Sequence, residues 1–324
     1  MSATAIIMAA GRSTRMKSRR PKVLHEICGK PMLGWVIDAC VEGGCEKIIV
    51  IVGHGKDEVI GQFQGDRRIH WVEQSEQLGT GHAVQMCQAE LKRLGGGDVF
   101  IVAGDGPLVR GQVLRTMRQA HQEARAAATM ATAVLDDPSG YGRIIRDGNG
   151  DFVEIIEQLD ATPQQRDIRE VFPSYYCVRV EDLLWSLGKL TNQNAKGEYY
   201  LTDIFGILQR GGRKVLAVQA VTAEDVLSVN TRQQQAEVDQ VMQERIQRKL
   251  RESGVAIAAA SGVYIEADVS IGPDTVVYPF SFIGRGASIG AECVIGPMAH
   301  VPRNGIVTEG STVAGVLSIP EVGQ

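Results

Sequence analysis

Tyr264 to Val301 reads YIEADVSIGPDTVVYPFSFIGRGASIGAECVIGPMAHV, and an aliphatic residue stands at every sixth position of this stretch. The period continues to position 319, and its ten residues are Ile265, Ile271, Val277, Ile283, Ile289, Ile295, Val301, Val307, Val313 and Ile319. A six-residue period fits neither a helix nor a plain strand. It is typical of a parallel β-helix, in which each hexapeptide makes one flat side and its aliphatic residue points inward. With three sides to a coil, residues 255–324 are predicted to form a short parallel β-helix of about three coils.

A polar segment, residues 231–254, precedes the repeat and is predicted to be a connecting helix. Val238, Val241, Met242 and Ile246 fall on one stripe of that helix. We expect this stripe to pack on the domain that comes before it.

Residues 1–230 alternate short apolar runs with amphipathic stretches. We expect strands at Thr4–Ala10, Lys47–Val52, Ile69–Val72 and Asp98–Ala103, and helices at Pro31–Val41 and Ala83–Leu94. This alternation predicts βαβ units and therefore an α/β domain with a mostly parallel sheet. Ligands of such sheets bind beyond the carboxyl ends of the strands, so the loops after Ala10, Val72 and Ala103 are the expected place of a site.

Composition argues against several classes of protein. The 324 residues carry a formal charge of −4 and only 5% are aromatic, so we expect neither the basic surface nor the stacking platform of a nucleic-acid-binding protein. The longest aliphatic run, residues 48–52, is far shorter than the ~20 residues of a membrane span. The first residues lack a basic region, so we expect no signal peptide. The six cysteines show no metal-ligand spacing, which predicts free thiols in a reducing cytoplasm.

The segment after the first expected strand combines small residues with cations. Residues 9–16 read AAGRSTRM, and residues 21–24 read PKVL. Small residues let backbone N–H groups approach a phosphate or a base closely, and two cations can neutralise a polyphosphate. The spacing matches neither a Walker loop nor a GxGxxG dinucleotide motif. On residue types alone, a phosphate loop and a tight turn with a solvated basic stretch are equally good interpretations.

Further motifs follow in order along the chain. They are QSEQLGTGHA at residues 74–83, AGD at 103–105, DPSGYGR at 137–143, GEYYLTD at 197–203 and VNTR at 229–232. With the first segment, this order resembles the sugar-1-phosphate nucleotidyltransferases, and among them the bacterial bifunctional N-acetylglucosamine-1-phosphate uridyltransferase/glucosamine-1-phosphate acetyltransferase family. The resemblance implies a Rossmann-like nucleotidyltransferase domain in residues 1–230, followed by a left-handed β-helix.

The resemblance also implies roles for individual residues. Arg15 and Lys22 would be catalytic, with Arg15 holding the departing phosphates and Lys22 the α-phosphate and the sugar phosphate. Nucleotide contacts would come from Met8, Ala9, Ala10, Gly11, Gln74, Gly79, Thr80, Gly104 and Asp105. Sugar contacts would come from Gly142, Glu157, Tyr200 and Thr202, and the ligands of one Mg²⁺ from Asp105 and Asn230.

Some of these residues have a simpler structural interpretation. Asp105 could be a turn residue in Asp105-Gly106-Pro107, although its place directly after an apolar strand favours the metal. Thr202-Asp203 could be a helix cap. The histidines form no ligand spacing and are expected in the core or on the surface.

The chain departs from the family pattern on the sugar side and in the repeat. Gln158-Leu159 replaces a His-Lys pair, Phe172 replaces an asparagine that resembles a sugar contact, and Ala103 replaces a tyrosine. The family's β-helix is several coils longer and carries the acetyltransferase site. We therefore expect no acetyltransferase activity, and a repeat that supports a homotrimer instead.

These observations predict Mg²⁺-dependent uridylyl transfer from UTP to N-acetylglucosamine-1-phosphate in the cytoplasm, without a nucleic-acid or membrane partner. Two alternatives stay open. One keeps the chemistry but uses another sugar-1-phosphate, such as glucose-1-phosphate or another hexosamine phosphate. The other is a catalytically silent regulatory or scaffolding subunit.

Overall fold

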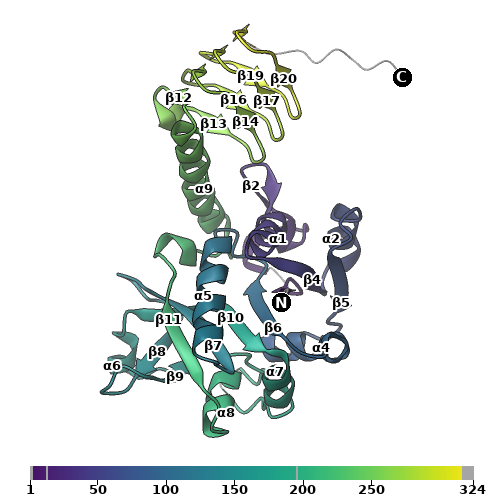
Figure 1. Cartoon of the computed structure of the whole chain (residues 1–324), viewed down its shortest axis with the longest axis vertical. Helices are drawn as coiled ribbons and strands as arrows, with labels where there is room; N and C mark the ends of the chain where they lie inside the picture. The colour runs from purple at the N-terminus through teal and green to yellow at the C-terminus, as the bar shows by residue number, and fades with distance from the viewer. Residues whose placement is uncertain (1–2, 12–13, 195, 316–324) are drawn as a thin grey trace. The chain divides into compact units, whose positions relative to one another are not determined.

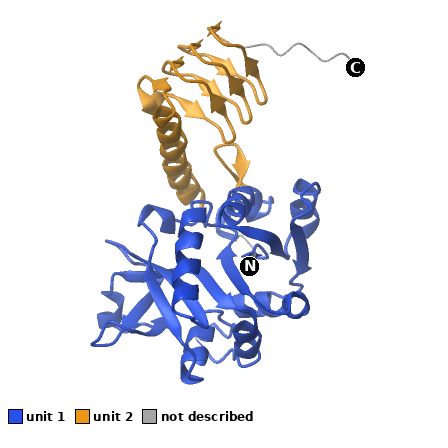
Figure 2. Ribbon diagram, viewed as in Figure 1, with its two compact units in different colours: residues 1–24, 32–230 blue, residues 25–31, 231–324 orange. Residues whose placement is uncertain are grey.

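The computed structural model describes residues 3–11, 14–194 and 196–315, and the chain falls into two compact units. Unit 1 comprises residues 1–24 and 32–230, and unit 2 comprises residues 25–31 and 231–324 (Figure 2). Residues 25–31, which the sequence analysis assigned to the first domain, therefore belong to unit 2. The positions Arg12, Ser13 and Ile319 of the sequence motifs lie outside the described residues.

Unit 1 is built on a nine-stranded sheet with the order β11-β7-β10-β6-β1-β4-β5, to which the hairpin β8–β9 is attached through β10 (Figure 1). Strand β10 runs antiparallel to both of its neighbours on this path, and the other six strands of the path share one direction. The mostly parallel α/β sheet that the sequence predicts is therefore confirmed. The strands are β1 (Ala3–Met8), β4 (Cys45–Val52), β5 (Ile69–Glu73), β6 (Asp98–Ala103), β7 (Ala128–Val134), β8 (Gly142–Arg146), β9 (Phe152–Ile156), β10 (Glu170–Arg179) and β11 (Val215–Gln219).

Helices cover both faces of this sheet because the central strands are apolar on both sides. Ile7 of β1 packs in one core with α1 and α5, whereas its neighbour Ile6 packs in a second core with α7 and α8. Both residues are fully buried. The helices are α1 (Met32–Glu42), α2 (Lys56–Gln62), α3 (Thr80–Gln85), α4 (Gln88–Leu94), α5 (Gly111–Glu123), α6 (Pro163–Arg166), α7 (Val180–Leu187) and α8 (Asp203–Arg210).

Two elements of unit 1 differ from the sequence prediction. The first strand ends at Met8 and not at Ala10. The Ala9 N–H still donates to Ile51 O of β4 at 2.9 Å, and the residues after it form a loop. The single helix expected over residues 83–94 is two helices, with a break at Cys87, whose φ of −83° and ψ of 2° are not helical. Neither glycine nor proline marks that break in the sequence.

The hexapeptide repeat of unit 2 forms three parallel sheets with the orders β12-β15-β18-β21, β13-β16-β19 and β14-β17-β20. Nine of the ten periodic aliphatic residues are described, and all nine are buried. This arrangement is consistent with the predicted left-handed β-helix. The strands are β12 (Ala256–Ile257), β13 (Tyr264–Ile265), β14 (Ser270–Ile271), β15 (Val276–Val277), β16 (Phe282–Ile283), β17 (Ser288–Ile289), β18 (Val294–Ile295), β19 (His300–Val301), β20 (Ile306–Val307) and β21 (Thr312–Val313).

The corners of the β-helix repeat with the same period. Every sixth residue from Asp268 to Gly310 has a positive φ, between 57° and 72°. L-residues other than glycine rarely adopt this conformation, and Asp and Asn tolerate it best. Glycine occupies only Gly286 and Gly310 of these corners, so most corners hold a residue with a side chain in the left-handed region.

A hairpin and a long helix complete unit 2. The hairpin pairs β2 (Glu26–Ile27) with β3 (Lys30–Pro31), and the helix α9 spans Arg232–Glu252. Helix α9 contacts β2, β12 and β13, and its Val238 and Met242 are buried. These three partners all belong to unit 2, although β2 lies in the segment that the sequence analysis assigned to the preceding domain. Among the described residues, no helix is long and apolar enough to cross a membrane.

Candidate active site

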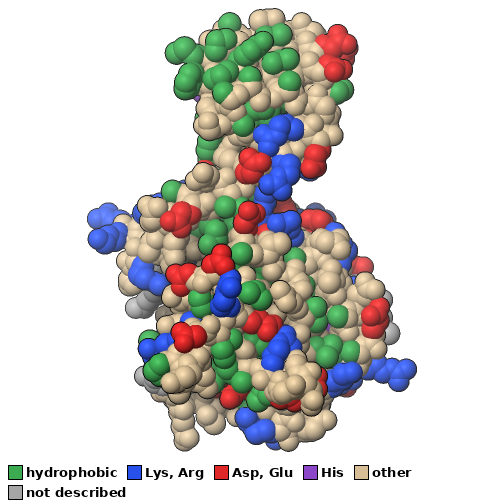
Figure 3. All heavy atoms as spheres, turned by 90° about the vertical axis from the view of Figure 1, so that its left-hand side faces the viewer, with side chains coloured by type: hydrophobic (Ala, Val, Ile, Leu, Met, Phe, Trp, Pro, Cys, Tyr) green, Lys and Arg blue, Asp and Glu red, His purple; other side chains and the backbone are tan. Residues whose placement is uncertain are grey.

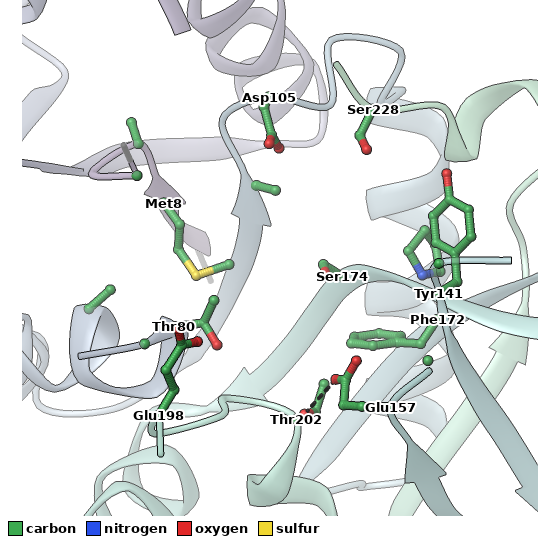
Figure 4. A pocket seen from close by; sticks show the side chains of 18 of the residues that line it. Met8, Thr80, Asp105, Tyr141, Glu157, Phe172, Ser174, Glu198, Thr202 and Ser228 are labelled. Atoms are coloured by element: carbon green, nitrogen blue, oxygen red, sulfur yellow. Dashed lines mark hydrogen bonds between the residues drawn. The ribbon is translucent and has the colours of Figure 1, made fainter. Parts of the chain in front are cut away.

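A cavity of about 490 Å³ opens in unit 1 beyond the carboxyl ends of β1 and β6. Figure 4 shows Met8, Thr80 and Glu198 on one side of it and Tyr141, Phe172 and Glu157 on the other. Of the residues that the sequence analysis singled out, Met8, Ala9, Gly11, Lys22, Gln74, Gly79, Thr80, Asp105, Gly142, Glu157 and Thr202 line the cavity. Ala10, Arg15, Gly104, Tyr200 and Asn230 do not line it.

The end of β1 and the end of β6 are tied together at the cavity. The Gly104 N–H donates to Met8 O at 2.9 Å, and a side chain at position 104 would bring a Cβ within 3.0 Å of that oxygen. Gly104 therefore lets the backbone after β6 approach β1 closely. Asp105, the next residue, therefore lies beyond the carboxyl end of β6, where it lines the cavity.

Gln74 follows β5 and is buried at one end of the cavity. Its Nε2 donates to Gly79 O at 3.1 Å and lies 3.1 Å from His82 Nδ1. A side-chain amide has two N–H donors, so both are used when Nδ1 accepts. The Oε1 atom has no such internal contact among the described residues and can serve a ligand donor. His82, expected in the core or on the surface, is thus a partner of Gln74.

The loop of Gly79 and Thr80 is clamped onto a distant segment of the chain. Gly79 has a φ of 114°, and a Cβ there would lie 2.5 Å from Tyr199 O, so only glycine fits. The Thr80 Oγ1 atom accepts the Leu201 N–H at 3.0 Å. These contacts join residues 78–81 to residues 199–201 and fix one wall of the cavity.

Lys22, which lines another part of the cavity, is the centre of a polar cluster. Its Nζ donates to a carboxylate oxygen of Asp105 and, at 2.7 Å, to Asn230 Oδ1. Arg15 Nη2 donates to the same Asn230 oxygen at 2.9 Å. The structure therefore brings both expected cations and both expected metal ligands together, from four separate parts of the sequence.

This cluster fits a divalent cation. Asp105 and Asn230 each present an oxygen toward one point that carries positive charge, now supplied by the Lys22 ammonium. Mg²⁺ prefers such hard oxygen ligands, takes few of them from protein and keeps water or phosphate oxygens for the rest. The described residues contain no group of three or more His, Cys, Asp or Glu side chains that could hold a metal ion.

The sugar side of the expected site is organised around Glu157. Thr202 Oγ1 donates to Glu157 Oε1 at 3.2 Å (Figure 4). Burial raises the pKa of the Glu157 carboxyl, and the Thr202 hydrogen bond partly offsets this. The helix-cap interpretation of Thr202 is corrected, because α8 begins after Thr202 without a side-chain cap and the hydroxyl is used by Glu157. Gly142 lies beside this pair, with an added Cβ 3.7 Å from Glu157 Oε2.

Phe172 and Leu159, two departures from the family pattern, have different surroundings. Phe172 lines the cavity, is 4% exposed and meets Tyr176 and Phe205 edge-on at centroid distances of 4.8 and 5.6 Å. Leu159 is 64% exposed and does not line the cavity. Gln158 accepts hydrogen bonds from the Gly140 N–H and from the Arg143 guanidinium, so it supports the loop before β8.

Several lining residues were not singled out as site residues from the sequence. They are Gln77, Tyr141, Ser174, Glu198 and Ser228, together with backbone and apolar positions between them. Tyr141 and Glu198 lie inside motifs that the sequence analysis quoted, so the motifs carried the signal. Ser174 has a φ of 66° at an irregularity of β10, where the preceding Pro173 is the sequence signal, since proline inside a strand is typical of a bulge or an edge.

Known proteins share the sequence pattern of this chain. Residues 5–175 match the family model of the MobA-like NTP transferase domain. The protein is similar to the "Bifunctional protein GlmU" of Alkaliphilus metalliredigens (strain QYMF), with 41% identity over 97% of this chain and 69% of that protein. It is also similar to the "Bifunctional protein GlmU" of Brevibacillus brevis (strain 47 / JCM 6285 / NBRC 100599), with 42% identity over 96% of this chain and 66% of that protein.

A solved structure shares the fold. The structure of UDP-glucose pyrophosphorylase complexed with UDP-glucose matches with a TM-score of 0.62 and 17% identity, over 76% of this chain and all of that one. The present chain spans roughly two thirds of the length of the two GlmU relatives. From the extent and identity of these matches, the chain belongs to the family of the bifunctional GlmU proteins, and its residues 5–175 carry a MobA-like NTP transferase domain.

Proposed function

We propose that this protein is a sugar-1-phosphate uridylyltransferase that transfers a uridylyl group from UTP to N-acetylglucosamine-1-phosphate, with Mg²⁺ as cofactor. The observation that carries the proposal is the hydrogen-bonded cluster of Arg15, Lys22, Asp105 and Asn230. Lys22 and Asp105 of this cluster line the same cavity as the carboxylate of Glu157. The GlmU family and the fold of UDP-glucose pyrophosphorylase support the same class of reaction.

The preference for uracil follows from Gln74. With His82 Nδ1 as the acceptor, its amide nitrogen is occupied by Gly79 O and His82, and the base would meet the carbonyl oxygen Oε1. Uracil carries an N3–H that can donate to this oxygen, whereas N3 of cytosine is an acceptor and would face it lone pair to lone pair. A buried polar group that is left unpaired by the wrong ligand gives strong discrimination.

The reaction needs positioning and charge neutralisation more than proton transfer. A phosphate oxygen of the sugar-1-phosphate is already anionic and attacks the α-phosphorus of UTP without a general base. The bond from the α-phosphorus to the bridging oxygen breaks, and pyrophosphate leaves with the bonding electrons. Lys22 would hold the α-phosphate and the attacking phosphate, and Arg15 the departing phosphates. Preorganised cations of this kind supply most of the stabilisation in phosphoryl-type transfers.

Asp105 and Asn230 would hold the Mg²⁺, which when bound neutralises phosphate charge as a Lewis acid. The departing end of the triphosphate also has a basic environment. A second hollow of about 610 Å³ shares Lys22 with the cavity and is lined by Lys17, Arg19, Arg20 and His54. These groups would meet the charge of the β- and γ-phosphates.

The sugar would bind at the end of the cavity with Glu157 and Thr202. An ionised Glu157 can accept hydrogen bonds from two sugar hydroxyls, and Gly142 leaves room beside it. Phe172 favours a second candidate function, in which the protein carries out the same reaction with another sugar-1-phosphate such as glucose-1-phosphate. Its ring offers an apolar surface to the cavity where the family pattern has an amide.

Two further expectations concern unit 2. Among its described residues, the exposed large hydrophobic side chains are Tyr278, Phe280, Phe282, Met298 and Ile306. Figure 3 shows hydrophobic side chains gathered on one face of the repeat. We propose that this surface forms a homotrimer. Phe280, at 75% exposure, is the variant of choice: Phe280→Glu should release monomers in light scattering, and a persisting trimer would place the interface elsewhere.

The absence of acetyltransferase activity also remains a proposal. His300 is the one histidine of residues 255–324, and its ring packs edge-on against Phe282 at 5.3 Å. A mixture of acetyl-CoA and glucosamine-1-phosphate should therefore release no free coenzyme A thiol above the background rate. Thiol release that scales with protein concentration would contradict this.

The deciding experiment measures pyrophosphate release with Mg²⁺, four nucleoside triphosphates and a panel of sugar-1-phosphates. Release with UTP and N-acetylglucosamine-1-phosphate supports the proposal, and release with another sugar keeps the mechanism but moves the substrate. Release with no pair would favour the silent regulatory or scaffolding subunit.

A further inference from the structure

Gly142 and Glu157, two of the proposed sugar contacts, are neighbours in the wall of the cavity. Both line it, and a Cβ added to Gly142 would lie 3.7 Å from Glu157 Oε2. The pairing of β8 with β9 does not include Glu157, because at this end it stops with Arg143 and Ile156. Glu157 lies one residue beyond the end of β9, so strand pairing alone does not hold it beside Gly142.

The residues that follow these two contacts, Arg143 and Gln158, are hydrogen-bonded to each other. Arg143 Nη2 donates to Gln158 Oε1 at 2.7 Å. Neither residue lines the cavity. Successive positions of a strand face opposite sides, so Arg143 in β8 points away from the cavity that Gly142 lines. The pair of Arg143 and Gln158 therefore supports the cavity wall from behind.

The same oxygen of Gln158 also binds the loop before β8. The Gly140 N–H donates to Gln158 Oε1 at 3.3 Å, and the Arg143 guanidinium donates to Tyr141 O. Gly140 and Tyr141 both line the cavity. Among the described residues, every side-chain hydrogen bond between the turn after β9 and this loop or the start of β8 ends on Gln158 Oε1. One amide oxygen thus connects the segment that carries Glu157 to the loop.

Burial fixes the guanidinium to which this oxygen is bound. Arg143 is 1% exposed, and its Nε and Nη2 atoms also donate to Arg166 O of α6, each at 3.3 Å. The hydrogen-bond partners of the guanidinium are all neutral oxygens. A buried charge depends on such bonds, since a donor left without an acceptor bears the cost of its lost hydration. Arg143 therefore has little freedom to move away from Gln158.

We propose that Arg143 and Gln158 are positioning residues for the transfer reaction, which set the distance between Glu157 and the loop without contacting a substrate. The inference rests on the proposed function, because that proposal places the sugar beside Glu157. Catalysis of this kind is sensitive to placement, and a misplacement of about 1 Å can cost about a hundredfold in rate. Loss of the acceptor at position 158 would leave Glu157 in the cavity but spread its positions. The base end, around Gln74, has contacts of its own and should keep its geometry.

The test compares Gln158→Leu with the unchanged full chain by calorimetric binding of UDP, UDP-N-acetylglucosamine and UDP-glucose in the presence of Mg²⁺. No pyrophosphate is present, so the ligands bind without reacting. We expect the dissociation constant of the UDP-sugar to rise about fivefold to tenfold, as for the loss of one hydrogen bond, while that of UDP stays unchanged. In the pyrophosphate-release assay, kcat/KM for the sugar-1-phosphate should fall about tenfold to a hundredfold, with little change in KM for UTP.

Two further variants serve as rescue and control. In Gln158→Glu, a carboxylate can accept from both the Gly140 N–H and the guanidinium, so this variant should restore both values. Gln164→Leu is the matched control, because Gln164 is exposed on α6 and does not line the cavity, and it should leave both values unchanged. If Gln158→Leu does not fold, Gln158→Asn, whose amide is one methylene shorter, should shift the same constants in the same direction.

The outcomes separate this inference from the proposed function. A lower melting temperature of Gln158→Leu with unchanged UDP-sugar binding and unchanged kcat/KM means that the pair only stabilises the hairpin, and overturns the inference. An equal rise in the dissociation constants of UDP and of the UDP-sugar also overturns it, because the whole cavity would then be loosened. An unchanged protein that binds none of these ligands and releases no pyrophosphate overturns the proposed function, and the inference with it.

Discussion

Replacing Lys22 with methionine should lower the turnover number and at the same time strengthen metal binding. The Lys22 side chain is 14% exposed and that of Asp105 is 26% exposed, so the pair lies in a partly buried environment. Two unit charges about 4 Å apart attract each other by about 4 kcal/mol at the effective dielectric constant of such sites. The ammonium therefore competes with a metal ion for Asp105 and Asn230, although the cost of removing both charges from water offsets much of that attraction.

We expect the Mg²⁺ concentration for half-maximal activity of Lys22→Met to fall about fivefold to tenfold, because roughly 1 kcal/mol of this competition is removed. The kcat should fall about a hundredfold to a thousandfold, which is the usual effect of losing one preorganised donor to a charged transition state. Methionine keeps most of the length of the lysine side chain without its charge, so the fold should survive. Pyrophosphate release measured against Mg²⁺ concentration gives both quantities, and the melting temperature serves as the control. A near-normal kcat would remove Lys22 from the chemistry, and an unchanged Mg²⁺ requirement would show that the ammonium and the metal use different positions.

Three further predictions concern the two ends of the cavity. Gln74→Leu removes the acceptor for the uracil N3–H. KM for UTP should therefore rise about tenfold, and the preference for UTP over CTP should decrease. An unchanged ratio of kcat/KM for the two nucleotides would exclude Gln74 from base recognition. Thr202→Val should shift the acidic limb of the pH–activity profile to higher pH. Burial already raises the pKa of Glu157, and removal of the Thr202 hydrogen bond should raise it further. A higher pH is then needed to ionise the carboxylate. A pH–activity profile that does not move would mean that ionised Glu157 is not required. Because Glu157 binds its proton more tightly in the folded state, the variant's stability should also fall as pH rises through that pKa. Phe172→Ala should lower the free energy of unfolding by about 3–5 kcal/mol, since a buried ring in contact with Tyr176 is removed; a loss below 1 kcal/mol in urea unfolding would mean that the cavity end is not packed as described.

The period of the repeat could be found in the sequence because each side of the β-helix needs one inward-facing aliphatic residue. The membership of residues 25–31 in unit 2 could not, since it depends on pairs such as Cys28 with Asp239, 211 positions apart. The break at Cys87 was equally hidden, because the residues around it all accept helical conformation. Local pattern therefore predicted the elements, and non-local hydrogen bonds decided how they were grouped.

The candidate site shows the same division. Order of motifs suggested that Lys22 and Asn230 belong to one site, and the structure brings them into contact across 208 positions. The partner of Thr202 could not be inferred, because a threonine before a helix is a natural cap and only the fold brings Glu157 within reach. The supporting role of Gln158 also required the structure, since it acts through Arg143 and not on the cavity itself.

The regular corners of the β-helix restrict how its gene can change in length. From β13 to β18, each strand pairs with the strand eighteen residues further on, as Ile265 does with Ile283. An insertion of one residue within a side would turn every later aliphatic residue outward and every later corner out of its left-handed conformation. Evolution can therefore lengthen or shorten this array most easily by whole coils, and relatives with arrays of different length should differ by multiples of about eighteen residues.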